Sequence, residues 1–225
     1  MKKLFLVMTA LLAAGWASAQ EFSFGPKVGV NISDLYIQAD GIEESAIRGV
    51  KPALVIGGFA EYRFLPKLSL SAEVLYSRQG SQSDRYVHRG NPMFGEQNSS
   101  YEHEYTLQYL NIPVLVNFYL TDGLAIKAGI QPGFLLGADF EVDVEAEGQK
   151  YSDKTNIKDD LRTFDLSIPL GLSYTFDYGF FLDARYNLAL SDLMKDDTKA
   201  ALEMEGVTYH KMKNRVFAIT VGWKF

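Results

Sequence analysis

The sequence predicts an all-β protein, an eight-stranded antiparallel up-and-down transmembrane β-barrel with short periplasmic turns and long extracellular loops. Three observations predict this fold. Apolar side chains alternate with small or polar ones in eight segments, the connectors between these segments are long and short in turn, and the chain begins with an export signal. Alternation with a period of two is typical of a strand with two different faces. An even number of such strands, with short turns on one side, is typical of outer-membrane barrels.

The first element is a signal peptide, predicted over residues 1–19. Lys2 and Lys3 precede an apolar run, and Ala17-Ser18-Ala19 provides an A-x-A cleavage site. The apolar run is shorter than the roughly 20 residues that a membrane-spanning helix needs. We therefore expect export through the Sec pathway, cleavage of this segment, and a single barrel domain over residues 20–225 in the cell outer membrane.

Composition excludes several classes of protein. The 22 basic residues include Lys2 and Lys3, so the mature chain keeps 20 of them against 28 acidic residues, a formal charge of −8. Nucleic acid is therefore not an expected partner. The chain has no cysteine, which rules out disulfides and thiolate metal sites. No later segment approaches 18 uninterrupted apolar residues, so a chain that enters the membrane must do so as a closed barrel.

The predicted strands follow one another along the whole mature chain. They cover residues 22–33, 50–64, 68–82, 104–120, 124–140, 161–176, 179–190 and 214–225. Their long connectors are residues 34–49, 83–103, 141–160 and 191–213, and their short ones are 65–67, 121–123 and 177–178. With an even number of strands, the short turns and both ends of the barrel lie on the periplasmic side.

Side-chain volume predicts which face of the wall meets lipid. In the segment 161–176, large apolar residues from Phe164 to Phe176 alternate with small or polar residues such as Ser167 and Gly171. The interior of an eight-stranded barrel is only just wide enough for side chains, so eight apolar stripes would overfill it. We therefore expect the apolar stripes to face lipid, which disfavours the reversed pattern of a soluble lipocalin-like barrel.

Aromatic residues and prolines add two expectations about the wall. Aromatic residues gather beside the short turns, as with Tyr119, and more thinly at the opposite strand ends, as with Tyr105. This distribution predicts two interfacial girdles. Proline donates no ladder hydrogen bond, so bulges or strand ends are expected where prolines fall within the segments, at Pro26, Pro52, Pro113, Pro132 and Pro169.

Charged residues on the opposite face predict a lumen network. Buried charges are costly unless they pair, so the sequence predicts salt bridges across a closed lumen. The alternative is an ion or solute pathway, although eight strands leave no continuous aqueous channel. The expected members of the network are Lys27, Glu61, Arg63, Glu73, Lys127, Asp165, Asp183 and Arg185.

A run of acidic residues at alternate positions predicts a hairpin arm outside the membrane. On an extended chain these side chains share one face, and the return strand would bring Lys154, Lys158 and Arg162 near them. The stripe is interpreted either as a solvated, charge-protected hairpin or as a docking edge or divalent-cation site. Its members are Asp139, Glu141, Asp143, Glu145 and Glu147.

The last long connector predicts a short helix with Asp197 as its N-cap and Gly206 just beyond its end. The nearby apolar residues would either cover the barrel mouth or offer a patch to a partner, and both alternatives stay open. These residues are Leu193, Met194, Leu202 and Met204.

Several stretches carry a resemblance to a known family. They are Gly25 to Asn31 (GPKVGVN), Leu70 to Gly80 (LSAEVLYSRQG), Tyr109 to Pro113 (YLNIP) and Ala128 to Gly133 (AGIQPG). Over nearly the whole mature chain, the sequence resembles the PorT-like outer-membrane β-barrel family of Gram-negative bacteria. The resemblance implies the fold and the location, and namesake members are linked to protein secretion and gliding. Trp223 and the terminal Phe225 resemble the signal that barrel assembly machinery recognises.

We interpret the chain as a non-enzymatic outer-membrane barrel with a closed polar lumen, acting in envelope integrity, in surface interaction, or in a secretion or assembly system. The alternatives are a passive pore for small solutes and, less favoured, a lipid-modifying enzyme that uses His88, His103 or His210. No catalytic motif accompanies these histidines. The expected partners are outer-membrane lipid, the barrel assembly machinery during biogenesis, and a protein at the external loops or the periplasmic rim. No cofactor or metal is expected.

Overall fold

The computed structural model describes residues 21–39, 51–82, 86–88, 99–146, 149–204, 206 and 208–225. Their strands are β1 (Glu21–Ala39), β2 (Lys51–Leu65), β3 (Leu68–Gln82), β4 (Tyr86–His88), β5 (Ser99–Asn111), β6 (Val114–Tyr119), β7 (Leu124–Ala146), β8 (Gln149–Asn156), β9 (Phe164–Thr175), β10 (Phe180–Ala189) and β11 (Tyr209–Trp223). The helices are α2 (Asp196–Met204) and two 3-10 turns, η3 (Lys158–Asp160) and η4 (Asp177–Gly179). No helix within these ranges has the length and apolar character to cross a membrane.

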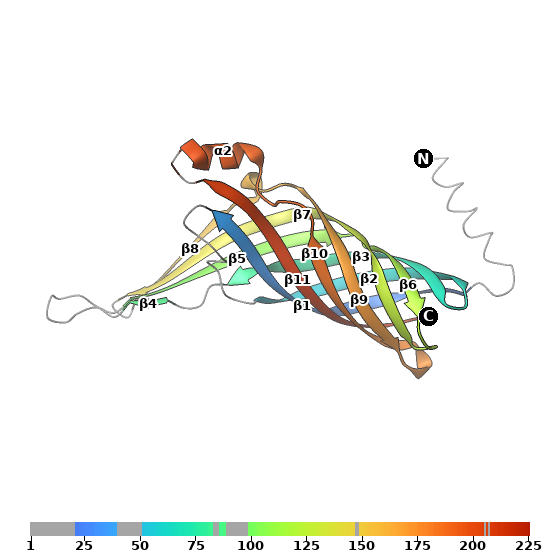
Figure 1. The fold of residues 1–225 in the computed structure, drawn as a ribbon. Helices are drawn as coiled ribbons and strands as arrows, with labels where there is room; N and C mark the ends of the chain where they lie inside the picture. Colours follow the sequence, from blue (N-terminus) through green and yellow to red (C-terminus); the bar gives the residue numbers. More distant parts are fainter. Residues whose placement is uncertain are drawn as a thin grey trace, which may run out of the picture.

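The strands close into an antiparallel barrel with eight strand positions around its ring, one of them shared by β5 and β6, which confirms the predicted fold (Figure 1). The order around the ring is β1, β2, β3, β5 with β6, β7, β9, β10 and β11. β5 and β6 form one wall, interrupted at Ile112-Pro113, because both pair with β3 and β7 in one register. The seam is the β1–β11 ladder, in which Lys27 lies opposite Gly222.

The two faces of the wall have the predicted orientation. On β11, Phe217, Ile219 and Trp223 are about 40% exposed, whereas Val216 and Thr220 are buried in the lumen. Lipid therefore contacts the large apolar stripes, and the narrow interior takes the small and polar residues.

Both aromatic girdles form, with two exceptions. Beside the short turns, the exposed aromatics include Phe22, Phe118 and Trp223, but Tyr119 is only 5% exposed and points into the lumen. At the other end Phe134, Phe164 and Tyr186 are exposed, whereas Tyr105 packs against the buried core. Tyr119 and Tyr105 occupy the alternate positions of their strands that face the lumen, so their assignment to the girdles is wrong.

The prolines disturb the sheet less than expected. Pro113 lies in the break between β5 and β6, and Pro52 is the second residue of β2, as anticipated. Pro26, Pro132 and Pro169 instead lie inside strands whose register does not shift beside them, although the β7–β9 pairing skips Pro169. The expectation of bulges or strand ends is wrong for these three residues.

The predicted arm extends beyond the ring. β7 continues to Ala146, β8 returns beside it, and β5 flanks its other edge, so three strands project from the end of the barrel opposite the C-terminus (Figure 1). β4 adds a short fourth strand on the outer edge of β5. The membrane wall and the arm are therefore one continuous sheet.

A β-bulge marks the base of the arm. The β5–β7 register shifts between Gln108, which lies opposite Gly137, and Tyr109, which lies opposite Leu135. The extra residue of β7 exchanges its two faces. Below the bulge, even-numbered residues such as Phe134 face lipid, but above it Ala138 is fully buried on the inner side.

Helix α2 begins at Asp196, so Asp197 belongs to its first turn, and its assignment as the N-cap is wrong. Gly206 follows the helix with a positive φ of 86°, a conformation that favours glycine. The neighbouring Leu193 is 1% exposed at the barrel mouth. The helix therefore sits at the extracellular end, beside the mouth (Figure 1).

Candidate functional site

Five of the predicted lumen residues form one buried cluster at the centre of the barrel. The Arg185 guanidinium donates to both oxygens of Glu73, at 2.8 and 3.1 Å, which is the bidentate geometry of strong ion pairs. Lys27 also contacts Glu73, at 3.2 Å, and reaches Asp183 at 3.4 Å. Lys127 binds the other oxygen of Asp183 at 2.9 Å. All five side chains are nine-tenths buried or more.

The cluster joins opposite walls of the ring. Arg185 on β10 and Glu73 on β3 lie four strand positions apart around the ring of eight. Lys27 on β1 and Lys127 on β7 are separated in the same way. Asp183 connects the second pair because each of its oxygens binds one of the two lysines. Two diameters of the barrel are thus bridged by side chains, which closes the lumen.

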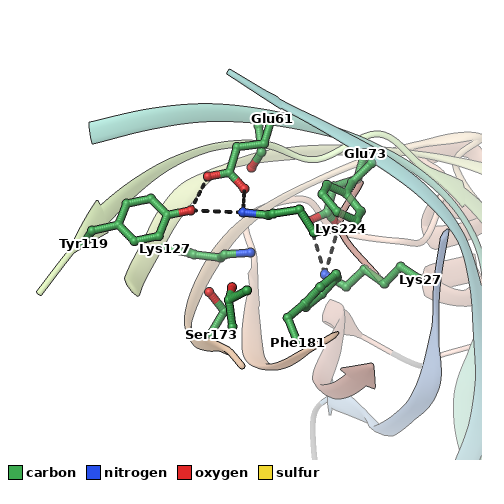
Figure 2. Close-up of a pocket in the computed structure, with 11 residues that line it drawn as sticks. Lys27, Glu61, Glu73, Tyr119, Lys127, Ser173, Phe181 and Lys224 are labelled. Atoms are coloured by element: carbon green, nitrogen blue, oxygen red, sulfur yellow. Dashed lines mark hydrogen bonds and ion pairs between the residues drawn. The ribbon is translucent and has the colours of Figure 1, made fainter. Parts of the chain in front are cut away.

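A second polar cluster lies on the periplasmic side. Lys224 donates to Glu61 at 2.8 Å (Figure 2). Ser69 donates to the same carboxylate at 2.5 Å. The Tyr119 hydroxyl donates a further, short hydrogen bond to Glu61. Lys224 shares the inward face with the predicted residues and lies within the predicted strand 214–225, but it was not among the predicted members of the network.

Amide and hydroxyl groups fill the next layer toward the cell exterior. Asn31 on β1 donates to Ser77 on β3 at 2.7 Å, and Gln79 donates to the same hydroxyl at 2.8 Å. Asn214 on β11 donates a short hydrogen bond to Gln79. Neutral polar groups thus link three walls above the charged cluster.

An apolar plug occupies the extracellular end of the lumen, and the sequence anticipated only the contribution of Leu193, Met194 and Leu202, as one of two alternatives. Its buried residues come mainly from the barrel strands and from the last long connector, and Met194 and Leu202 pack against it. Met204 is 89% exposed, so only part of the connector covers the mouth. A detectable signal was the inward parity of several leucines near the extracellular strand ends. The plug consists of Leu35, Leu107, Tyr109, Leu135, Ala138, Leu161, Leu193 and Met212.

Little free space remains among the lumen charges. The cavity lined by Lys27, Lys127 and Lys224 measures about 10 Å³, room for about one water molecule. A larger cavity of about 370 Å³ opens at the periplasmic rim, where Arg63 and Phe225 line it. The wide part of the lumen is therefore a shallow vestibule below the closed centre.

Two predicted members belong to neither of the two charged clusters. Arg63 lies at the periplasmic rim, where it pairs with Glu21 at 3.5 Å and stacks on the Tyr119 ring at 3.9 Å. Asp165 lies on β9 opposite Gly133, near the apolar plug, and one of its oxygens is buried without a hydrogen-bond partner. Parity placed both on the inner face but could not give their height along the barrel axis.

The acidic stripe lies on the outer face of the arm, because the bulge exchanges the two faces of β7. Asp139 pairs with Lys154 at 3.3 Å and Asp143 with Lys150 at 3.2 Å, whereas Glu147 lies outside the described residues. Arg162 does not join the stripe, since it binds Asp196 at 2.6 Å, and Lys158 belongs to η3. Glu141 and Glu145 complete the described part of the stripe.

Hydrogen bonding tunes two carboxylates of the arm. Donors on Ser152 and Lys150 lower the pKa of Asp143 below its usual range. Partial burial would raise the pKa of Glu104, but the hydrogen bond and charge of Lys51 outweigh it and lower that pKa. Both groups are therefore ionised at neutral pH.

The opposite face of the arm is aromatic. Phe140 stacks against His103, with centroids 5.8 Å apart, and packs on Tyr105 at 4.6 Å. His210 is exposed on β11, and β4 includes His88. In the described part of the chain, no group of three or more His, Cys, Asp or Glu residues has a metal-binding arrangement.

The two residues of the proposed assembly signal lie at the seam on the periplasmic side. Trp223 is 41% and Phe225 66% exposed, and the Phe225 backbone exchanges hydrogen bonds of 2.9 and 3.3 Å with Phe24. The Phe225 and Phe24 rings lie 6.0 Å apart on the outer face. The terminal residue thus completes the ladder that closes the ring.

Comparison with known proteins gives the family. The model of the outer membrane protein beta-barrel domain matches residues 18–195, more than half of the chain. The chain belongs to this family. The cell outer membrane is accordingly its location. A search of the curated proteins found no match.

Solved structures share the fold at low sequence identity. The attachment invasion locus protein Ail of Yersinia pestis is 13% identical, with 91% of this chain and 99% of Ail covered and a TM-score of 0.46. Neisserial surface protein A is also 13% identical, with 92% and 100% covered and a TM-score of 0.41. OprG of Pseudomonas aeruginosa is 12% identical, with 91% and 95% covered and a TM-score of 0.38. These similarities concern the fold alone.

Proposed function

We propose that this protein is a non-enzymatic outer-membrane barrel whose lumen is a structural core and whose external arm binds another component of the cell envelope. The role would lie in envelope integrity, surface interaction, or a secretion or assembly system. The observation that carries the proposal is the closure of the lumen, where Glu73, Asp183 and their cationic partners bridge opposite walls. A lumen occupied in this way suits a rigid support better than a passage.

The biogenesis proposed from the sequence is part of this function. Residues 1–19 would be removed after export through the Sec pathway, leaving the barrel of residues 20–225, and the assembly machinery would recognise Trp223 and Phe225. The resemblance to the PorT-like family supports a link to secretion or gliding as one form of the role. Outer-membrane lipid and a protein partner at the arm or the periplasmic rim are the proposed partners.

The arm is the proposed binding element for such a partner. Its two faces differ, since Glu141 and Glu145 lie on the acidic face, and Phe140 and His103 on the aromatic one. An amphipathic sheet outside the membrane can bind through either face. The passive pore receives no support from a central cavity of about 10 Å³, and no arrangement of the described histidines favours lipid chemistry.

Planar bilayers test the closed lumen. Purified protein is expected to give no stable single-channel conductance. Reproducible channels that are lost or altered in Lys127→Ala or Glu73→Ala would overturn the proposal, because those residues lie at the closed centre. A variant with the exposed substitution Lys67→Ala controls for changes outside the lumen.

Crosslinking in cells tests the binding role. A photoreactive residue at Glu141, on the arm, is expected to capture one discrete partner, whereas the same residue at Glu203 on α2 serves as a matched exposed control. A barrel with residues 139–156 replaced by a short turn should still fold but should fail to rescue the envelope phenotype of a deletion strain. A full phenotype rescue by this armless barrel would contradict the role of the arm.

A further inference from the structure

The charges of the two lumen clusters do not balance, and the other inward carboxylate, Asp165, lies near the apolar plug, apart from both clusters. The central and periplasmic clusters hold four cations, on Lys27, Lys127, Arg185 and Lys224, but only three carboxylates, on Glu61, Glu73 and Asp183. The rim pair of Arg63 and Glu21 is neutral as a whole. One positive charge is therefore in excess, and it belongs to the central cluster, whose five side chains are all nine-tenths buried or more. An uncompensated buried charge is strongly unfavourable.

The excess charge is concentrated at two converging ammonium groups. Lys27 and Lys127 approach from opposite walls, and each Nζ lies 5.9 Å from the centre of the Phe181 ring. They bind different oxygens of Asp183, which also accepts from Arg185 at 3.3 Å, so one carboxylate serves three cations. Figure 2 shows both ammonium groups pointing into the space that Lys224 enters from a third direction.

The lining of this space favours a negative guest. The cavity of about 10 Å³ is bordered by both ammonium groups and by the hydroxyls of Ser173 and Thr175, which can donate hydrogen bonds. The lining carboxylates are already engaged, Glu73 by Arg185 and Lys27, and Glu61 by Lys224. The remaining hydrogen-bonding capacity thus consists mostly of donors.

Loss of a proton from one lysine would also remove the excess charge, but it would weaken existing ion pairs. Lys127 makes the shorter of the two lysine contacts to Asp183, at 2.9 Å, and Lys27 contacts both Glu73 and Asp183. Breaking one side of a buried pair is strongly destabilising. A bound anion neutralises the excess while every ion pair stays intact.

We propose that the cavity between Lys27 and Lys127 binds a small monovalent anion of the size of chloride. The ammonium groups provide the charge, and the hydroxyls of Ser173 and Thr175 complete the donor set. The space of about 10 Å³ excludes organic anions and phosphate. The anion is a permanent part of the closed core, so the site stabilises the barrel and requires no conductance.

Bromide locates the site directly, because it replaces chloride and scatters anomalously. Crystals of the protein soaked in bromide are expected to show an anomalous peak within hydrogen-bonding distance of both Lys27 and Lys127 Nζ. The peak should vanish in Lys127→Met, which removes the excess charge while keeping a long side chain, and persist in Lys67→Met, a change at an exposed turn lysine. Absence of the peak from the unsubstituted protein, or its persistence in Lys127→Met, would overturn the proposal.

Unfolding in solution provides a second measurement that does not need the variant to crystallise. A ligand that binds only the folded state raises stability with its concentration. At constant ionic strength, replacing gluconate by chloride should shift the urea midpoint upward for the unsubstituted protein and Lys67→Met, but not for Lys127→Met. If Lys127→Met does not fold, the bromide peak and the chloride shift of the unsubstituted protein decide. A midpoint that is independent of chloride would show that the excess charge is removed by a neutral lysine.

Discussion

Replacement of Glu73 by glutamine tests the lumen core most sharply. The carboxylate accepts four contacts, two from Arg185 at 2.8 and 3.1 Å and two from Lys27 at 3.2 and 3.4 Å. Glutamine keeps the shape but not the charge, which leaves two buried cations with weakened partners. Removing one member of a buried ion pair costs about 3–5 kcal/mol. We expect Glu73→Gln to lower the free energy of unfolding by about that amount, a large share of the roughly 5–15 kcal/mol typical of folded domains.

Urea unfolding of the mature protein in lipid vesicles measures this loss. Trp223 is the only tryptophan outside the predicted signal peptide and reports on the seam through its fluorescence. Glu203→Gln on the exposed face of α2 is the control and should stay within about 0.5 kcal/mol of the unsubstituted protein. The double variant with Arg185→Met should lose less than the sum of the two single losses, since the two residues are directly coupled. A Glu73→Gln loss under about 1 kcal/mol, or strict additivity, would refute the reasoning.

Two further predictions concern the ends of the barrel. Deletion of Phe225 should reduce the amount of heat-modifiable, assembled barrel in the outer membrane without reducing export, because the residue completes the ladder with Phe24. Equal assembly of the deleted and full chains would contradict this prediction. Glu203→Gln serves as the control. The lowered pKa of Glu104 means that its contact with Lys51 contributes stability above the usual glutamate range and loses it as the pH falls through the lowered pKa. The protection factors of the amides at the base of the arm, which correct for the intrinsic pH dependence of exchange, should therefore fall on acidification, and less so in Glu104→Gln. An equal fall in both proteins would count against the contact.

The wall of the barrel was predictable because its pattern is local. Alternation within each segment gave the strands, and the loop lengths gave the sides of the membrane. The narrowness of an eight-stranded interior gave the direction of the faces. The segment 104–120 was one predicted strand, and the structure divides it at Ile112-Pro113 without changing its register. The fold thus depends on periodicity and on length, and both can be counted in the sequence.

The sequence predicted which residues face the lumen, but it did not predict their positions along the barrel axis. Parity assigns a residue to the inner face, yet the vertical position depends on strand tilt and register across walls. Arg63 and Asp165 therefore lie toward opposite ends, although both are on inward positions. The apolar plug was anticipated only in part for a different reason, since Leu35, Leu193 and Met212 lie in predicted connectors, where alternation assigns no face.

The bulge between Leu135 and Gly137 has a consequence for the solvent that each surface meets. Below the bulge the outer face of β7 is apolar, whereas above it the outer face carries the acidic residues, because one additional residue shifts the alternation. The same uninterrupted strand can therefore face lipid along one stretch and water along the next. If β7 kept every residue but ran through Gly137 without the bulge, regular alternation would point Asp139 inward and Phe140 outward. Such an arm would expose apolar side chains to water and would tend to aggregate, while the barrel below it would be unchanged.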